Sequence, residues 1–196
     1  MKTPIFEDYF FYLVKLPKFG YHLLVGAVLC CIPIAHFFAF GYLYQLTSSI
    51  HQNQRLELPE WTNWTQLFHD GLRFSVPWFF FWLFPLILAT VLKWGLEAIS
   101  MDLFGSLFLL CALLSANCLF SAAVYLLHTK RNLKVLLHYQ TIIRLCLRDR
   151  WQLVIPTCVA LTPLLALPQV YGLAYFASAL VFLPYCSLLW TLQSSK

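Results

Sequence analysis

The segment GYLYQLTSSIHQNQRLELPEWTNWTQLFHDGLRF, residues 41–74, decides how the rest of the chain is interpreted. It is the longest interval without a run able to cross a bilayer, and apolar segments lie on both sides of it. Crossing the hydrocarbon core takes about 20 predominantly apolar residues. Because the flanking runs reach that length, the sequence predicts an integral membrane protein.

The second half of this segment predicts an amphipathic helix over about 59–70. Pro59 suits a first helical turn, where its missing N–H costs nothing, and Gly71 suits the residue just after a helix. The apolar residues recur at steps of three and four: Trp61, Trp64, Phe68 and Leu72. Since tryptophan favours the headgroup level, we expect this helix to lie in the membrane surface. The alternative is a short helix packed on the other loops.

The composition supports one membrane domain over residues 1–196. Of the 196 residues, 61% are hydrophobic and 11% are charged, and the mean hydropathy is +0.72. A soluble domain has about a quarter charged residues. The net charge of +5 favours contact with anionic lipid headgroups. No run of aromatic and basic residues suits base stacking, so we expect no nucleic-acid partner.

Hydropathy and periodicity predict an all-α polytopic protein with about five transmembrane helices and two or three interfacial amphipathic helices. The expected spans are 20–46, 75–94, 103–127, 151–168 and 171–190. The expected interfacial helices are 3–15, 59–70 and 130–149. Pro33 predicts a kink in the first span, and a re-entrant first segment is the alternative. The small residues of 103–127 predict that this helix is the most buried, with Asn117 bonded to a neighbouring helix.

The segment 129–150 has the clearest helical periodicity, with basic residues along one side. A basic amphipathic helix joined to spans belongs on the membrane surface. Its simpler interpretation is a solvated linker that sets topology, and the alternative is a dock for an anionic headgroup or an acidic partner. The residues predicted to contact lipid or a partner are Trp61, Trp64, Arg131, Lys134, Arg144 and Arg148.

Charge also predicts the orientation in a cell (inner) membrane. The six Lys and Arg residues of 129–150 place this segment in the cytoplasm. Counting spans from there places the loop 50–74 and the C-terminus on the same side and the N-terminus outside. A first segment that is re-entrant at Pro33 would instead satisfy the basic residues near the N-terminus.

Candidate cofactor chemistry is confined to His36, the one ionisable side chain expected well inside the membrane. It could bind a cofactor or relay a proton, but a packed histidine bonded to backbone near Pro33 is the simpler interpretation. Seven cysteines fall mostly in apolar runs without a metal-ligand spacing, which indicates packing. We therefore expect no cofactor, no metal and no catalytic residue.

Part of the sequence resembles a prokaryotic multi-pass membrane family catalogued as domain of unknown function 4013. The resemblance covers about residues 20–75 and rests on these positions: Gly26, Ile32-Pro33-Ile34, Gly41-Tyr42, Leu58-Pro59-Glu60-Trp61, Trp64, Leu67-Phe68 and Asp70-Gly71-Leu72. It implies a helical membrane protein. It implies no activity.

The expected function is a non-enzymatic integral membrane protein, a scaffold or accessory subunit packed against other membrane protein subunits. No GxSxG, HExxH or glycine-rich phosphate loop is present. The first alternative is a small transporter or channel, for which the kinked spans and His36 are the motivation. The second alternative is a membrane-surface lipid-handling enzyme that uses Glu60, His69 and Asp70.

Overall fold

The computed structural model describes residues 6–53, 56–130, 132–166 and 171–194, and every regular element in these ranges is helical. The elements are α1 (Phe6–Lys15), α2 (Phe19–Cys30), α3 (His36–Asn53), α4 (Trp64–Trp78), the π-helix η1 (Phe79–Leu83), α5 (Phe84–Glu97), α6 (Asp102–Lys130), the 3₁₀-helix η2 (Leu133–Leu137), α7 (Tyr139–Arg148), α8 (Arg150–Ala166) and α9 (Tyr171–Ser194). The predicted all-α class is confirmed. Within the described residues, three helices, or four if one bent pair is a single span, are long and apolar enough to cross a membrane, which is slightly fewer than the five predicted.

The helices α4, η1 and α5 form one continuous helix over Trp64–Glu97. It begins where the Asn63 side chain accepts a hydrogen bond from the backbone N–H of Gln66 at 3.2 Å. The separate surface helix predicted at 59–70 is therefore wrong, as is the start of a span at residue 75. Asn63, not Pro59, caps the first turn. The turn widens into η1 immediately before Pro85, which has no N–H to donate.

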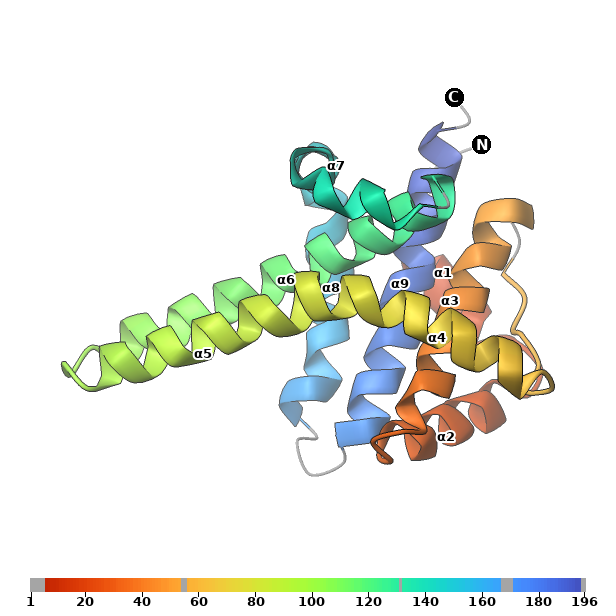
Figure 1. The fold of residues 1–196 in the computed structure, drawn as a ribbon, viewed down its shortest axis with the longest axis horizontal. Helices are drawn as coiled ribbons and strands as arrows, with labels where there is room; N and C mark the ends of the chain where they lie inside the picture. Colours follow the sequence, from red (N-terminus) through yellow and green to blue (C-terminus); the bar gives the residue numbers. More distant parts are fainter. Residues whose placement is uncertain (1–5, 54–55, 131, 167–170, 195–196) are drawn as a thin grey trace.

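This long helix and α6 form an antiparallel hairpin whose far end extends beyond the other helices (Figure 1). Residues 74–92 hold no charged side chain, while Arg73 precedes them and Lys93, paired with Glu97, follows. At a rise of 1.5 Å per residue, Arg73 and Lys93 lie about 30 Å apart along the helix, the thickness of a hydrocarbon core. The hairpin thus has the dimensions of two membrane spans.

The most buried helix is α9, not the predicted α6. Within its most apolar window, 78% of α9 is buried against 39% for α6. The reason is position: α9 packs against α2, α3, α6 and α8, whereas the first half of α6 contacts mainly α5 in the projecting hairpin (Figure 1). The prediction for Asn117 is confirmed, because its Oδ1 accepts a hydrogen bond from Trp82 Nε1 at 3.2 Å.

The first predicted span, 20–46, is broken. Helix α2 ends at Cys30 and α3 begins at His36, with Pro33 in the turn between them. Proline removes a helical hydrogen bond and disfavours helix in the residue before it. A second break separates α1 from α2, which meet at 91° just after the predicted surface helix ends at Lys15. This bent pair is the possible fourth span.

Helices α3 and α4 approach each other closely at two glycines, Gly41 and Gly71. A Cβ atom on Gly41 would lie 1.8 Å from the carbonyl oxygen of Leu67, and one on Gly71 would lie 1.9 Å from that of Phe37. Gly71 therefore sits inside the helix, where only glycine fits, and does not end it. Both glycines belong to the stretch on which the family resemblance rests.

The prediction of a single helix over 130–149 is wrong. Helix α6 continues to Lys130, η2 follows, and α7 begins at Tyr139 after a break at His138. Arg131 and residues 167–170 lie outside the described residues. The last two predicted segments, 151–168 and 171–190, correspond to α8 and α9 with shifted ends.

Candidate functional site

Two polar stripes on α3 and α4 face each other near the end of α6. The α3 stripe consists of Gln45, Ser48, Ser49 and Gln52, at the spacing i, i+3, i+4 and i+7. The α4 stripe consists of Gln66, Asp70 and Arg73, at i, i+4 and i+7. Each spacing places its residues on one helix face. The glycine contact between α3 and α4 holds these two faces at a fixed separation.

The stripes line a partly open cavity of about 690 Å³, which we call the α3–α4–α6 cavity. Its remaining lining comes from α3, the last turn of α6 and the residues after it: Tyr44, His51, Leu127, His128, Asn132 and Leu133. Only two of its lining residues are aliphatic. The size is within the range of small-molecule sites, and the lining is more polar than is usual for them.

The cavity presents both signs of charge. Asp70 is 8% exposed, and its Oδ2 accepts a hydrogen bond from Gln45 Nε2 at 2.9 Å. Arg73, one helical turn further along α4, is exposed. Within the described ranges, neither Asp70 nor Arg73 has an oppositely charged group within 4.0 Å. The charges of this pair are thus both available to a ligand.

A histidine forms the α6 wall of the cavity. His128 is 6% exposed, and its Nε2 lies 2.8 Å from the hydroxyl oxygen of Thr47. The ring of Tyr44 lies 4.5 Å from the His128 ring, centroid to centroid. Thr47 is completely buried, so its hydroxyl cannot reach a molecule in the cavity. The Thr47–His128 pair therefore fixes α6 against α3.

The predicted site residues of the N-terminal half do not gather at this cavity. His36 is the first residue of α3, half-buried, with its ring 4.4 Å from that of Phe37. Trp61 is buried and stacks on Tyr42 at 4.3 Å, so it presents little surface to lipid. Trp64 is 45% exposed, and its contact with lipid stays a prediction.

The three residues of the enzyme alternative are not brought together either. Asp70 lines the α3–α4–α6 cavity, whereas Glu60 lines a separate cavity of about 550 Å³ beside α1 and α2. His69 lines neither of them. Within the described parts of the chain, no group of three metal-binding side chains is present.

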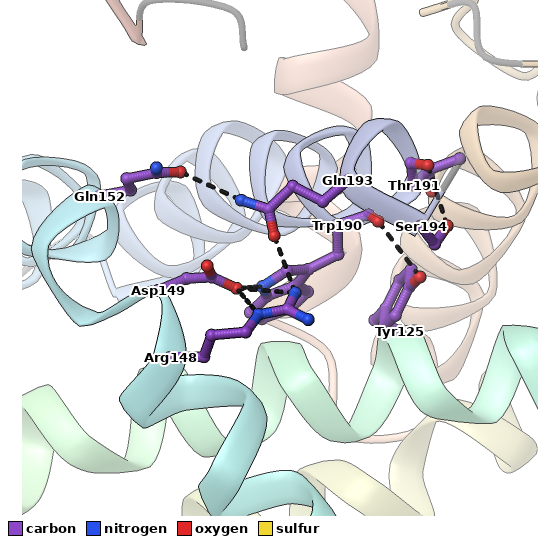
Figure 2. Close-up of polar contacts among 8 residues, drawn as sticks. All are labelled: Tyr125, Arg148, Asp149, Gln152, Trp190, Thr191, Gln193 and Ser194. Atoms are coloured by element: carbon purple, nitrogen blue, oxygen red, sulfur yellow. Dashed lines mark hydrogen bonds and ion pairs between the residues drawn. The ribbon is translucent and has the colours of Figure 1, made fainter. Parts of the chain in front are cut away.

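Among the predicted basic residues, Arg148 takes part in a polar network (Figure 2). Lys134 and Arg144 are exposed. Arg148 donates from Nε and Nη2 to Oδ2 of the buried Asp149, at 3.1 and 3.0 Å, and from Nη2 to Gln193 at 2.8 Å. The same Asp149 oxygen accepts from Trp190 Nε1 at 3.0 Å. Arg148 therefore helps to attach α7 to α9.

A cysteine on α7, Cys146, provides a test of how α7 packs against α6. Burial, with smaller contributions from nearby Cys118 and Asp149, raises the pKa of Cys146 to about 12. Its Sγ donates to the carbonyl of Cys118 at 3.2 Å. Since the thiolate is the reactive form, we expect iodoacetamide at pH 9 to label Cys146 at least ten times more slowly in the folded protein than in SDS.

This labelling is measured by mass spectrometry on a variant with Cys146 as its only cysteine. The folded-state rate should keep rising with pH up to about 12, because the fraction of thiolate grows over that range. Equal labelling rates in the folded and SDS-unfolded protein at pH 9 would contradict the packed position of α7.

Sequence reasoning missed the α3–α4–α6 cavity, although the signal was present. The predicted first span, 20–46, includes Gln45 but ends before the other polar residues of the α3 stripe, and the predicted surface helix, 59–70, includes Gln66 and Asp70 but ends before Arg73. Their matching i, i+3/4, i+7 spacing indicates two helix faces that need polar surroundings. The burial of His128 depends on its contact with Thr47 of α3, which the sequence does not reveal.

One family model matches the chain: a protein of unknown function (DUF4013), over residues 24–130. The match covers more than half of the 196 residues and runs from α2 to the end of α6. All lining residues of the α3–α4–α6 cavity except Asn132 and Leu133 lie within it. No curated protein and no solved structure matches the chain.

Proposed function

The chain belongs to the DUF4013 family of unknown function, and from its structure we propose that it is a non-enzymatic integral membrane protein that binds a polar ligand. The observation that supports this is the α3–α4–α6 cavity, with its polar lining and two charges, Asp70 and Arg73, that form no ion pair within the described residues. Polar groups are costly to keep inside a membrane protein unless they pair or contact water and ligand. Binding or passage of a polar solute would account for the polar and charged side chains of the α3–α4–α6 cavity.

A binding role fits the site better than catalysis does. Within the described chain, the arrangement at the cavity that most resembles a nucleophile and base is Thr47 with His128, and Thr47 is fully buried. Catalysis needs reacting groups that touch the substrate. A transporter or receptor needs only a selective polar cavity, which corresponds to the transporter alternative drawn from the sequence.

We place the protein in a prokaryotic cell membrane with residues 50–74 and 129–150 in the cytoplasm. The support is the excess of basic residues around η2 and α7. The α3–α4–α6 cavity lies beside the end of α6 and the start of this basic segment. In this orientation the cavity opens at the cytoplasmic headgroup layer.

The test is native mass spectrometry of the protein extracted gently from its own membrane. Ser48, on the cavity wall, is replaced by tryptophan to fill the cavity, and Ser106, exposed on the hairpin, is replaced by tryptophan as the control. We expect a small-molecule adduct on the wild type and Ser106→Trp, reduced at least tenfold on Ser48→Trp. An adduct of equal abundance on all three, or none on the wild type, would contradict the proposal.

A second candidate function is the accessory subunit expected first from the sequence. The observation that favours it is the α5–α6 hairpin, which projects beyond the other helices (Figure 1) and carries many exposed apolar residues. Such a hairpin in a membrane contacts either lipid or other subunits. The same native mass spectra decide between these cases, because a stable mass containing a second protein supports the subunit role and a bare chain with its small ligand excludes it.

A further inference from the structure

We propose that the ligand of the α3–α4–α6 cavity is a zwitterion, a compound with an ammonium group and an anionic group a few ångströms apart. This inference rests on the proposed function and specifies it. Its basis is the pair of opposite charges on α4, Asp70 and Arg73, which line the same cavity without pairing to each other.

The two charges are close enough for one small molecule to bind both. Residues at i and i+3 of a helix have Cβ atoms about 5–6 Å apart on the same face. In many surface helices such a pair forms its own salt bridge, but here the Asp70 carboxylate turns to Gln45 Nε2 at 2.9 Å. The Arg73 guanidinium is left at the exposed edge of the cavity.

The Asp70 carboxylate selects the cationic end of the ligand. It is 8% exposed and holds one amide hydrogen bond and no charged partner in the described structure. A buried charge without a counter-charge is strongly unfavourable. A primary ammonium, with three N–H donors, supplies both the charge and the hydrogen bonds, whereas a trimethylammonium supplies only the charge.

Arg73 selects the anionic end. A guanidinium matches the planar or tetrahedral oxygens of a carboxylate or phosphate through paired N–H donors. The remaining lining adds a hydroxyl group from Ser48 and an amide group from Gln66, which suit the oxygens of such a group. Two sources share this chemistry: the phosphoethanolamine headgroup of a lipid and a free amino acid.

Isothermal titration calorimetry on the full chain in detergent tests the inference with four probes. These are glycerophosphoethanolamine, glycerophosphocholine, L-alanine and sucrose. Binding of glycerophosphoethanolamine at least tenfold tighter than glycerophosphocholine supports a lipid headgroup, and binding of L-alanine supports a free amino acid. In either case Asp70→Asn and Arg73→Gln should each weaken binding about tenfold or more, and Ser48→Trp should abolish it.

Several results would overturn the inference. Sucrose binding that Ser48→Trp removes, without binding of either ammonium probe, would disprove the zwitterion and leave the proposed function intact. Equal affinity of a zwitterion for the wild type and Arg73→Gln would also disprove it, and this exposed position keeps the test valid if Asp70→Asn does not fold. If the native mass spectra show no small-molecule adduct on the wild-type protein, both the proposed function and this inference are wrong.

Discussion

Replacing Gly41 by alanine is expected to lower the free energy of unfolding by more than about 3 kcal/mol. The new Cβ would lie 1.8 Å from the carbonyl oxygen of Leu67, which is a backbone atom and cannot rotate away. The helices α3 and α4 would have to separate along their whole contact. Gly71→Ala, whose Cβ would meet the Phe37 carbonyl at 1.9 Å, should have an effect of similar size.

The matched control is Gly95→Ala in α5, where nothing lies within 4 Å of the added Cβ. Since glycine inside a helix costs up to about 1 kcal/mol relative to alanine, this variant should be slightly more stable than the wild type. Unfolding is measured by titrating the protein in mild detergent with SDS, and circular dichroism monitors the loss of helix. Equal stabilities of Gly41→Ala and Gly95→Ala would show that the α3–α4 contact is not as close as described.

Replacing Trp190 by alanine is expected to cost about 4 kcal/mol. Trp190 is 1% exposed, and its Nε1 donates to the buried Asp149 carboxylate at 3.0 Å (Figure 2). The change removes a large packed ring and one hydrogen bond to a buried charge. Trp190→Phe, which keeps most of the ring but loses the donor, should cost about 2 kcal/mol.

These variants are compared by the same SDS titration. Trp94→Ala is the control, because Trp94 is 63% exposed near the far end of the hairpin and its loss should change stability by less than about 1 kcal/mol. If Trp190→Phe is as stable as the wild type, the hydrogen bond to Asp149 contributes nothing to stability. If Trp190→Ala, Trp190→Phe and Trp94→Ala have equal free energies of unfolding, Trp190 is not packed in the centre of the protein and α9 is not its central helix.

The sequence predicts a helical protein with membrane-spanning segments, because the length and apolar composition of a segment can be judged without knowing its tertiary contacts. Helices α6, α8 and α9 begin within a few residues of their predicted starts, and the break near Pro33 follows from one missing N–H. The start of α4 was also available from the sequence. Asn63 followed three residues later by Gln66 resembles a capping box, and it outweighs Pro59 as a helix start.

Other features depend on contacts between distant residues. Gly71 looks like a helix terminator until α3 is placed against it, and only then does its missing side chain become a packing requirement. The α3–α4–α6 cavity needs the same contact, together with the end of α6. Sequence periodicity marks the polar face of each helix separately, but it does not show which faces meet.

The packing of α2 against α9 also has a consequence for biosynthesis. Helix α2 finds its main partner in the last helix of the chain, and Gly172 at the start of α9 approaches the backbone of Ala27. Roughly 140 residues are made between the two, which takes about 7–28 s at translation rates of about 5–20 residues per second. During that interval the nascent chain holds α2 without its native neighbour. A ribosome-bound intermediate that lacks α9 should therefore be the stage at which quality-control proteases recognise this protein most readily.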